Sequence, residues 1–204
     1  VVGPTGSGKT TLINLLVRFY DPTTGKVCIN GQDIRTLDTS AFRAKMALVM
    51  QEPFLFSGSI RDNIVQGNGT ISDQAMADIL EASNCKRFID GQPDGLDTQL
   101  SEGGTTISSG ERQLISIARA MARNPDLIIL DEATSYIDST TEQQIQEALD
   151  NLLSDQTSIV IAHRLSTARN ADRITVLNRG RIIESGTHAK LMDSRGFYFR
   201  LTQL

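Results

Sequence analysis

The residues G-P-T-G-S-G-K-T, at positions 3–10, constrain this chain more than any other stretch. They match the phosphate-loop pattern G-x-x-x-x-G-K-[ST], in which glycines allow successive backbone N–H groups to surround phosphate oxygens. Lys9 is expected to reach the β- and γ-phosphates of a nucleotide, and Thr10 to offer its hydroxyl to Mg²⁺. A Gly-rich turn that contains Lys and Thr by coincidence is the alternative, and the complete match argues against it. The candidate phosphate contacts are Gly3, Pro4, Thr5, Gly6, Ser7, Gly8, Lys9 and Thr10.

A helix is predicted directly after this loop, from Thr11 to Tyr20. Its apolar residues recur at helical spacing, and Asp21-Pro22 is expected to end it. The loop would therefore lead into a helix N-terminus, whose partial positive charge favours phosphate. A phosphate loop normally follows a buried strand of about 5–6 residues, and only residues 1–2 precede this one. We therefore expect N-terminal strands to be missing, as in a fragment of a longer chain.

The composition narrows the class of protein. The 204 residues suffice for one core, or for a core with an inserted lobe. The net charge of −4 and the lack of a Lys/Arg run argue against a nucleic-acid partner. Cys28 and Cys85 lack metal-ligand spacing and are expected to be structural thiols. With no membrane-length apolar run and no signal peptide, the sequence predicts a soluble cytosolic domain and leaves open whether a membrane part precedes it.

Short apolar runs alternate with helical patterns along the chain. A continuous run such as L-I-I-L is typical of a strand covered on both faces. Alternating strands and helices predict an α/β fold with a mainly parallel sheet. The predicted strands are residues 26–30, 46–50, 127–130, 158–162, 173–177 and 182–184.

The helical part is predicted mainly between Glu52 and Ala122, as an insertion into the α/β core. Ser72 is expected to cap one of its helices. A further helix is predicted over Ser139–Leu153, with a capping box formed by Ser139 and Glu142, and the tail 197–204 is predicted to be helical.

Polar residues follow several of the predicted strands, at the edge where an open parallel sheet binds ligands. Asp131 follows L-I-I-L and suits Mg²⁺, while Glu132 is placed to act as general base on water. A surface acid pair that caps a helix is the alternative. His163 follows S-I-V-I-A and could contact the γ-phosphate, although a lone histidine is more often structural. Gln51 follows M-A-L-V-M and gains weight only from the other three residues.

A second anion site is a possible interpretation of the segment 107–113. Ser108 and Glu111 have capping-box spacing at the start of a predicted helix. A serine hydroxyl, a glycine and free N–H groups at a helix start can bind an anion. A well-capped helix without a ligand fits equally well, and the residues alone leave both readings open.

The order of five motifs closely resembles the nucleotide-binding domain of an ABC transporter. The motifs are G-P-T-G-S-G-K-T, Q-E-P-F-L-F-S-G-S-I, I-S-S-G-E-R-Q, L-I-I-L-D-E-A-T-S and I-A-H-R-L-S-T. The resemblance covers essentially residues 1–204, and R-F-Y-D-P and L-F-S-G-S-I-R-D-N-I are most similar to the exporter branch. It implies a P-loop NTPase (RecA-like) core of residues 1–51 and 123–204, with a helical subdomain at 52–122 that carries the signature motif.

The resemblance also implies a role for each matching residue. Residues 3–10 with Thr11 resemble the Walker A loop, which binds ATP. Gln51 is similar to the Q-loop glutamine, which senses Mg²⁺ and the transmembrane domains. Asp131 and Glu132 resemble the Walker B aspartate and the catalytic glutamate. The implied Mg²⁺ ligands are Thr10, Gln51 and Asp131, and the implied catalytic residues are Glu132, His163 and Lys9.

Other implied roles involve partners. The segment 101–103 is similar to the exporter loop that touches the coupling helices, and Asp138 resembles the D-loop aspartate. His163 resembles the switch histidine. The signature motif, which closes over ATP held by the other subunit, would comprise Ser108, Ser109, Gly110 and Glu111.

Two departures from the family pattern matter. The signature is usually L-S-G-G-Q, whereas Ser109 replaces a glycine here and Glu111 places a carboxylate near anionic oxygens. If Glu111 faces the ligand it weakens binding; if it caps the helix it is harmless. The aromatic residue that stacks on adenine lies upstream of the phosphate loop in this family, outside this chain.

The resemblance therefore implies an ATP-hydrolysing motor domain of an ABC exporter, at the cytoplasmic face of a membrane. It would pair with a second such domain, identical or related, and with transmembrane domains fused upstream. The alternatives are a soluble ABC ATPase without a membrane partner, an asymmetric heterodimer with one impaired hydrolysis site, and a scaffold that has lost hydrolysis.

Overall fold

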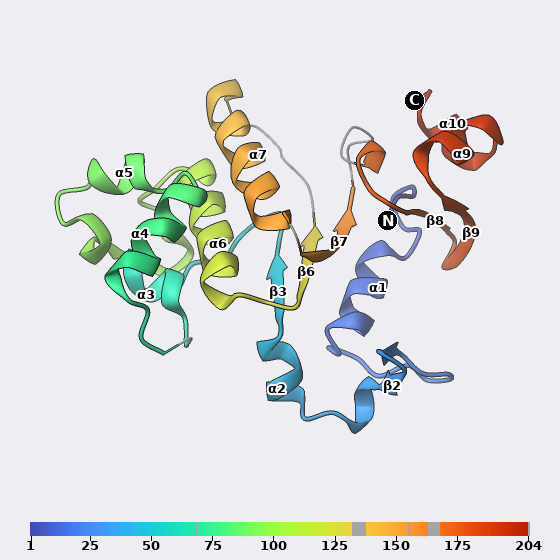
Figure 1. Ribbon diagram of the computed structural model, residues 1–204, viewed down its shortest axis with the longest axis horizontal. Coiled ribbons are helices and arrows are strands. Elements are labelled where there is room, and N and C mark those ends of the chain that lie inside the picture. Colours follow the sequence, from blue (N-terminus) through green and yellow to red (C-terminus); the bar gives the residue numbers. More distant parts are fainter. Residues whose placement is uncertain (68, 132–137, 155, 163–167, 204) are drawn as a thin grey trace. The chain divides into compact units, whose positions relative to one another are not determined.

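The computed structural model describes residues 1–204 except 68, 132–137, 155, 163–167 and 204 (Figure 1). The α-helices with assigned bounds are α1 (Lys9–Leu16), α2 (Thr39–Ala44), α3 (Ile60–Val65), α4 (Asp73–Ala82), α5 (Lys86–Asp90), α6 (Ser109–Arg123), α7 (Ser139–Leu153), α9 (His188–Asp193) and α10 (Phe197–Leu201). The strands are β1 (Cys28–Ile29), β2 (Gln32–Asp33), β3 (Met46–Val49), β4 (Gly58–Ser59), β5 (Gln99–Leu100), β6 (Leu127–Asp131), β7 (Thr157–Ile161), β8 (Ile174–Asn178) and β9 (Arg181–Gly186).

The chain divides into two compact units. The phosphate-loop unit comprises residues 1–43, 129–133 and 159–204, and the helical unit comprises residues 44–128 and 134–158. The subdomain limits expected from the sequence, at 51/52 and 122/123, stay a prediction.

The strands β3, β6 and β7 form a sheet in that order, with helices between them along the chain. Strand β6 is buried at its three central residues, as its continuous apolar run predicts. The expected α/β fold with a parallel sheet is confirmed.

In the phosphate-loop unit, the first two residues are built into the backbone hydrogen bonding of the strands. Val2 pairs in parallel with Val176 of β8, with Val2 N–H donating to Thr175 O at 3.0 Å. The carbonyl of Val1 accepts from Ala162 N–H at 3.0 Å. The apolar core around these residues consists of Val2, Ala162, Ala168, Ile174, Val176, Leu191 and Tyr198.

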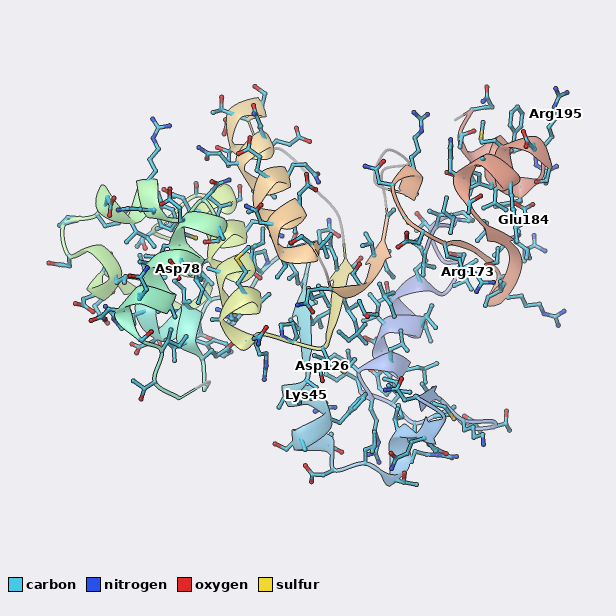
Figure 2. All side chains as sticks on the ribbon, in the orientation of Figure 1. Lys45, Asp78, Asp126, Arg173, Glu184 and Arg195 are labelled. Atoms are coloured by element: carbon cyan, nitrogen blue, oxygen red, sulfur yellow. The ribbon has the colours of Figure 1, made fainter. Side chains whose placement is uncertain are left out.

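In the helical unit, α6 is the central helix. It contacts α3, α4 and α7 and buries an apolar face that includes Leu114, Ile115 and Ile117. Side-chain amides also join segments of this unit, since Asn151 Nδ2 donates to Ala82 O at 2.9 Å. Where β3 and β6 begin, Asp126 N–H donates to Lys45 O at 2.9 Å, and the two side chains approach to 3.5 Å (Figure 2).

The first helix is shorter than the sequence predicts. It ends at Leu16 rather than Tyr20, because Arg18 adopts a left-handed backbone conformation with φ 56°. The Arg18 guanidinium donates to Ile34 O at 3.2 Å and to Thr39 Oγ1 at 3.1 Å. These tertiary contacts turn the chain before the apolar periodicity ends.

The predicted Ser139/Glu142 capping box is wrong. The N-cap of α7 is Asp138, whose Oδ1 accepts from the Thr140 and Thr141 amides at 3.1 and 3.0 Å. The bounds of the helix itself, Ser139–Leu153, are as predicted. The predicted cap at Ser72 is also confirmed, since its Oγ accepts from Ala75 N–H.

Two features differ from the sequence prediction or were not predicted. Strand β7 starts with exposed residues and becomes buried only at Ile161, so it is not buried throughout. Short antiparallel pairs form between β1 and β2 and between β4 and β5. Among the described residues, no helix combines the length and apolar character that a bilayer crossing requires.

Candidate functional site

The predicted phosphate loop leads directly into α1. Gly8 is the N-cap residue, with φ 102° and ψ 13°, a conformation that strongly favours glycine. Gly3 is required for space, because a Cβ there would lie 2.2 Å from Leu177 O. The loop therefore takes the backbone path that its glycines predict, and it ends at the positive end of a helix.

Lys9 lies over its own loop. Its side-chain Nζ donates to Gly3 O at 2.8 Å and to Pro4 O at 3.1 Å, and the residue is only 8% exposed. Burial lowers the pKa of Lys9, while the negative charge of Asp131 acts in the opposite direction. A buried cation held by neutral carbonyl groups can exchange these bonds for stronger ones to phosphate oxygens.

Asp131 is the last residue of β6, where the sequence places it, and it belongs to the same unit as Lys9. Thr10 and Thr11 are exposed in the first turn of α1. Hydroxyl and carboxylate oxygens are suitable Mg²⁺ ligands. In the described part of the chain, no cluster of three or more His, Cys, Asp or Glu could hold a metal. This donor set fits an ion that is bound by few protein groups together with phosphates and water.

The predicted catalytic residues Glu132 and His163 lie outside the described residues. Their roles therefore stay predictions. Of the predicted site residues in the phosphate-loop unit, Lys9 lies on the loop, and the negative charge of Asp131 acts on its ammonium group.

The signature segment begins α6 with the expected capping box. Glu111 Oε2 accepts from Ser108 N–H at 2.7 Å and from Ser108 Oγ at 2.8 Å. In return, Glu111 N–H donates to Ser108 Oγ at 3.2 Å. Ser109 is exposed and Gly110 is buried. Of the two positions considered for the Glu111 carboxylate, the structure shows the one that caps the helix. Whether this helix start also binds an anion stays a prediction.

This geometry predicts how Glu111 responds to substitution. In Glu111→Ala, α6 loses one half of its cap, and we expect a loss of about 1 kcal/mol in stability. In Glu111→Gln, the side-chain oxygen still accepts from Ser108 N–H, so stability should stay close to that of the wild type. Thermal unfolding of both variants measures the difference. Equal melting temperatures for Glu111→Ala and the wild type would contradict the role of the cap.

Two other predicted residues lie in the helical unit. Gln51 is exposed in the bend that follows β3. Asp138 caps α7, and the hydrogen bonds from the Thr141 and Thr140 amides hold the pKa of Asp138 below its usual range. Gln51 and Asp138 both belong to the helical unit.

Sequence reasoning missed two residues that contact the phosphate loop. Gly180 N–H donates to Ser7 O at 2.9 Å, and Leu177 O lies against Gly3. Both belong to the β8–β9 hairpin, about 170 positions along the chain from the loop. The turn residues Asn178–Gly180 indicate a hairpin, but nothing in the sequence shows what it packs against.

A phosphate-loop pattern that leads into a helix, with a buried lysine on the loop, in a chain of α/β fold, is typical of a P-loop NTPase. The sequence matches the family described as ABC transporter over residues 1–135, and the chain belongs to this family. The resemblance inferred from the motifs is thereby confirmed.

The chain is similar to several whole transporters. It is 47% identical to ABC transporter B family member 14 of Arabidopsis thaliana, in an alignment that covers 100% of this chain and 16% of that protein. It is 48% identical to the ATP-dependent lipid A-core flippase of Syntrophus aciditrophicus, covering 100% of this chain and 34% of that protein. The structure of a bacterial Atm1-family ABC exporter with ATP bound matches with a TM-score of 0.90 and 39% identity, over 99% of this chain and 35% of that one. The chain thus spans about a third of these relatives or less.

Proposed function

We propose that this chain is the ATP-binding and ATP-hydrolysing motor domain of an ABC exporter. The observation that carries the proposal is the phosphate loop, on which the buried Nζ of Lys9 lies at the start of α1. Similarity to an exporter with ATP bound, at 39% identity, supports ATP as the nucleotide.

Each described group has a task in this proposal. The loop amides and the positive end of α1 bind the phosphates, and Lys9 exchanges its bonds to Gly3 O and Pro4 O for bonds to the β- and γ-phosphates. Thr10 and Asp131, with Gln51, would hold Mg²⁺. When bound, this ion neutralises charge on the phosphate oxygens.

The catalytic assignments come from the motifs. Glu132 accepts a proton from the attacking water as general base, and His163 orients the γ-phosphate or that water. The segment Ser108–Gly110, with Glu111 as its cap, closes over ATP held by a second domain. Asp138, which matches the D-loop aspartate, is assigned to the same set of nucleotide-binding residues. ATP can drive this closure only by binding the closed state more tightly than the open state.

The proposed partners of this domain are inferred from the relatives. Their names describe transporters and a flippase, and the chain covers 16–34% of the two proteins compared above. We therefore infer that the whole protein also contains transmembrane domains, and that this domain works at the cytoplasmic face of the membrane.

The geometry of Glu111 bears on the alternative of an asymmetric pair with one impaired site. That alternative rested on two departures from the signature, Ser109 and the Glu111 carboxylate, and this carboxylate is bound to Ser108 at the helix start. Ser109 remains as a departure from the signature. Two ATP sites that both hydrolyse are therefore the proposed arrangement.

The variant Glu132→Gln tests the enzymatic part of the proposal in the full-length protein. We expect its ATP turnover to fall at least about 100-fold, because general-base catalysis contributes about 10²–10⁴-fold, while ATP binding is retained. Glu81→Gln, at an exposed glutamate of α4, is the matched control and should hydrolyse ATP normally. Undiminished hydrolysis in Glu132→Gln would remove this residue from its role.

A further inference from the structure

The β8–β9 hairpin lies directly against the phosphate loop. Gly180 N–H donates to Ser7 O at 2.9 Å. Leu177 O lies 2.2 Å from where a Cβ on Gly3 would be, so backbone meets backbone there. At the other end of the loop, Leu177 Cδ2 and Gly180 Cα lie 3.5 and 3.6 Å from where a Cβ on Gly8 would be. The hairpin therefore contacts both glycines that fix the path of the loop.

The hairpin turn depends on a backbone conformation that glycine adopts readily. Arg179 and Gly180 have φ angles of 48° and 72°, and they connect the paired residues Asn178 and Arg181. Two consecutive residues with positive φ are typical of the type I′ turn, which favours glycine at its second position. No atom lies within 4 Å of where a Cβ on Gly180 would be. A side chain at position 180 is thus opposed by the backbone conformation and not by a lack of space.

A β-bulge lies beside this contact. Val176 pairs with Glu184, but the next residue, Leu177, pairs with Ile182, so Ile183 is the extra residue on β9. A bulge kinks the strand and increases its twist. It lies beside Leu177, whose carbonyl meets Gly3, so the added twist falls next to the contact with the loop.

The C-terminal helices anchor β9 directly after the bulge. Glu184 is labelled in Figure 2. Its carboxylate accepts from the amides of Phe197 and Tyr198 at the start of α10. Tyr198 is fully buried, and its hydroxyl lies 2.9 Å from His188 Nδ1 in α9. All of these residues belong to the phosphate-loop unit. The turn is consequently held between the loop and an anchored strand.

We propose that Gly180 is a positioning residue for the phosphate loop. Its amide holds the carbonyl of Ser7, and through it the orientation of the neighbouring loop amides that would bind phosphate. The inference rests on the proposed function of the loop in nucleotide binding. A binding loop that is already in its bound conformation loses less entropy when the ligand arrives, so a displaced turn lowers affinity without touching the ligand.

The test compares three variants of the full-length protein. In Gly180→Val, a β-branched residue must adopt positive φ, and the turn has to change conformation. We expect the Kd for ATP to rise about tenfold, which corresponds to about 1.4 kcal/mol. In Gly180→Asn, the turn is retained because asparagine tolerates this conformation, and the Kd should stay within about twofold. The control is Gly25→Val, also at positive φ in the same unit and with no atom near a Cβ, which should leave the Kd unchanged.

A second measurement does not depend on ATP. Hydrogen–deuterium exchange of the peptide that covers residues 3–9 should become faster in Gly180→Val and stay unchanged in Gly25→Val. If the wild type bound no ATP, the proposed function would fail, and this exchange experiment would still decide the positioning role. Equal Kd values and equal exchange in the two valine variants would overturn the inference. So would a Gly180→Asn variant as impaired as Gly180→Val.

Discussion

Replacing Lys9 by methionine in the full-length protein is expected to reduce kcat/KM for ATP by about 10²–10³-fold, the effect of removing one donor that stabilises developing charge. Methionine keeps the length of the buried side chain but lacks the Nζ that lies on the loop. Steady-state ATPase assays measure the loss.

The matched control for this prediction is Lys26→Met, at an exposed lysine of the phosphate-loop unit. It removes the same charge from the same unit and should retain wild-type activity. The melting temperature of Lys9→Met should fall less than that of Arg119→Met, because the loss of the bonds to Gly3 O and Pro4 O is partly offset by the removal of a buried charge. Wild-type hydrolysis in Lys9→Met would contradict the assignment of the loop.

Replacing Arg119 by methionine is expected to lower the stability of the domain more than the other substitutions proposed above. The guanidinium donates to Asn63 O at 2.8 Å, to Asn63 Oδ1 at 3.0 Å and to Phe54 O at 3.0 Å, and it lies 5.8 Å from the centre of the Phe56 ring. Burial lowers the pKa of Arg119 to about 10. Because carbonyl groups lose a charged donor, we expect a cost of about 3 kcal/mol. For a domain of this size, that corresponds to a melting temperature roughly 6–12 °C lower.

The control for this prediction is Arg123→Met, at an exposed arginine one turn further along α6. Thermal unfolding of the full-length protein should show little change in this variant. Equal melting temperatures for Arg119→Met and Arg123→Met would show that the contacts of Arg119 contribute nothing to stability.

Local sequence patterns predicted the elements that depend on local physics. The strand bounds of β3 and β6 agree with their apolar runs to within one residue, and α7 agrees at both ends. The capping box at Ser108 is a local pattern too, and it is present. In each case the signal is a period or a spacing within a few residues, which a sequence displays directly.

The errors arose where contacts distant in sequence decide the structure. Helix α1 ends early because Arg18 reaches Ile34 and Thr39, and periodicity carries no information about such contacts. Strands β4 and β5 have two residues each and are about forty positions apart, so neither shows a strand pattern. The cap of α7 is a different kind of error, because Asp138 and Ser139 are both good N-cap residues and the wrong one was chosen.

In the candidate site, too, local patterns were predicted from the sequence and contacts distant in sequence were not. The loop, Lys9 and Asp131 are recognisable from residue types and spacing. The support of the loop by Gly180 is not, because it depends on the packing of a hairpin from the far end of the chain. Sequence reasoning thus identified the groups proposed to touch the nucleotide, and the structure added a group that holds the loop in place.

The most direct test of the account is the affinity of the full-length protein for ATP, ADP and AMP in the presence of Mg²⁺. The loop and Lys9 are proposed to bind the β- and γ-phosphates, so the affinity should rise with the number of phosphates, and AMP should bind weakest by a wide margin. Equal affinity for AMP and ATP would contradict the account, because the binding energy would then come from the nucleoside and not from the phosphate loop.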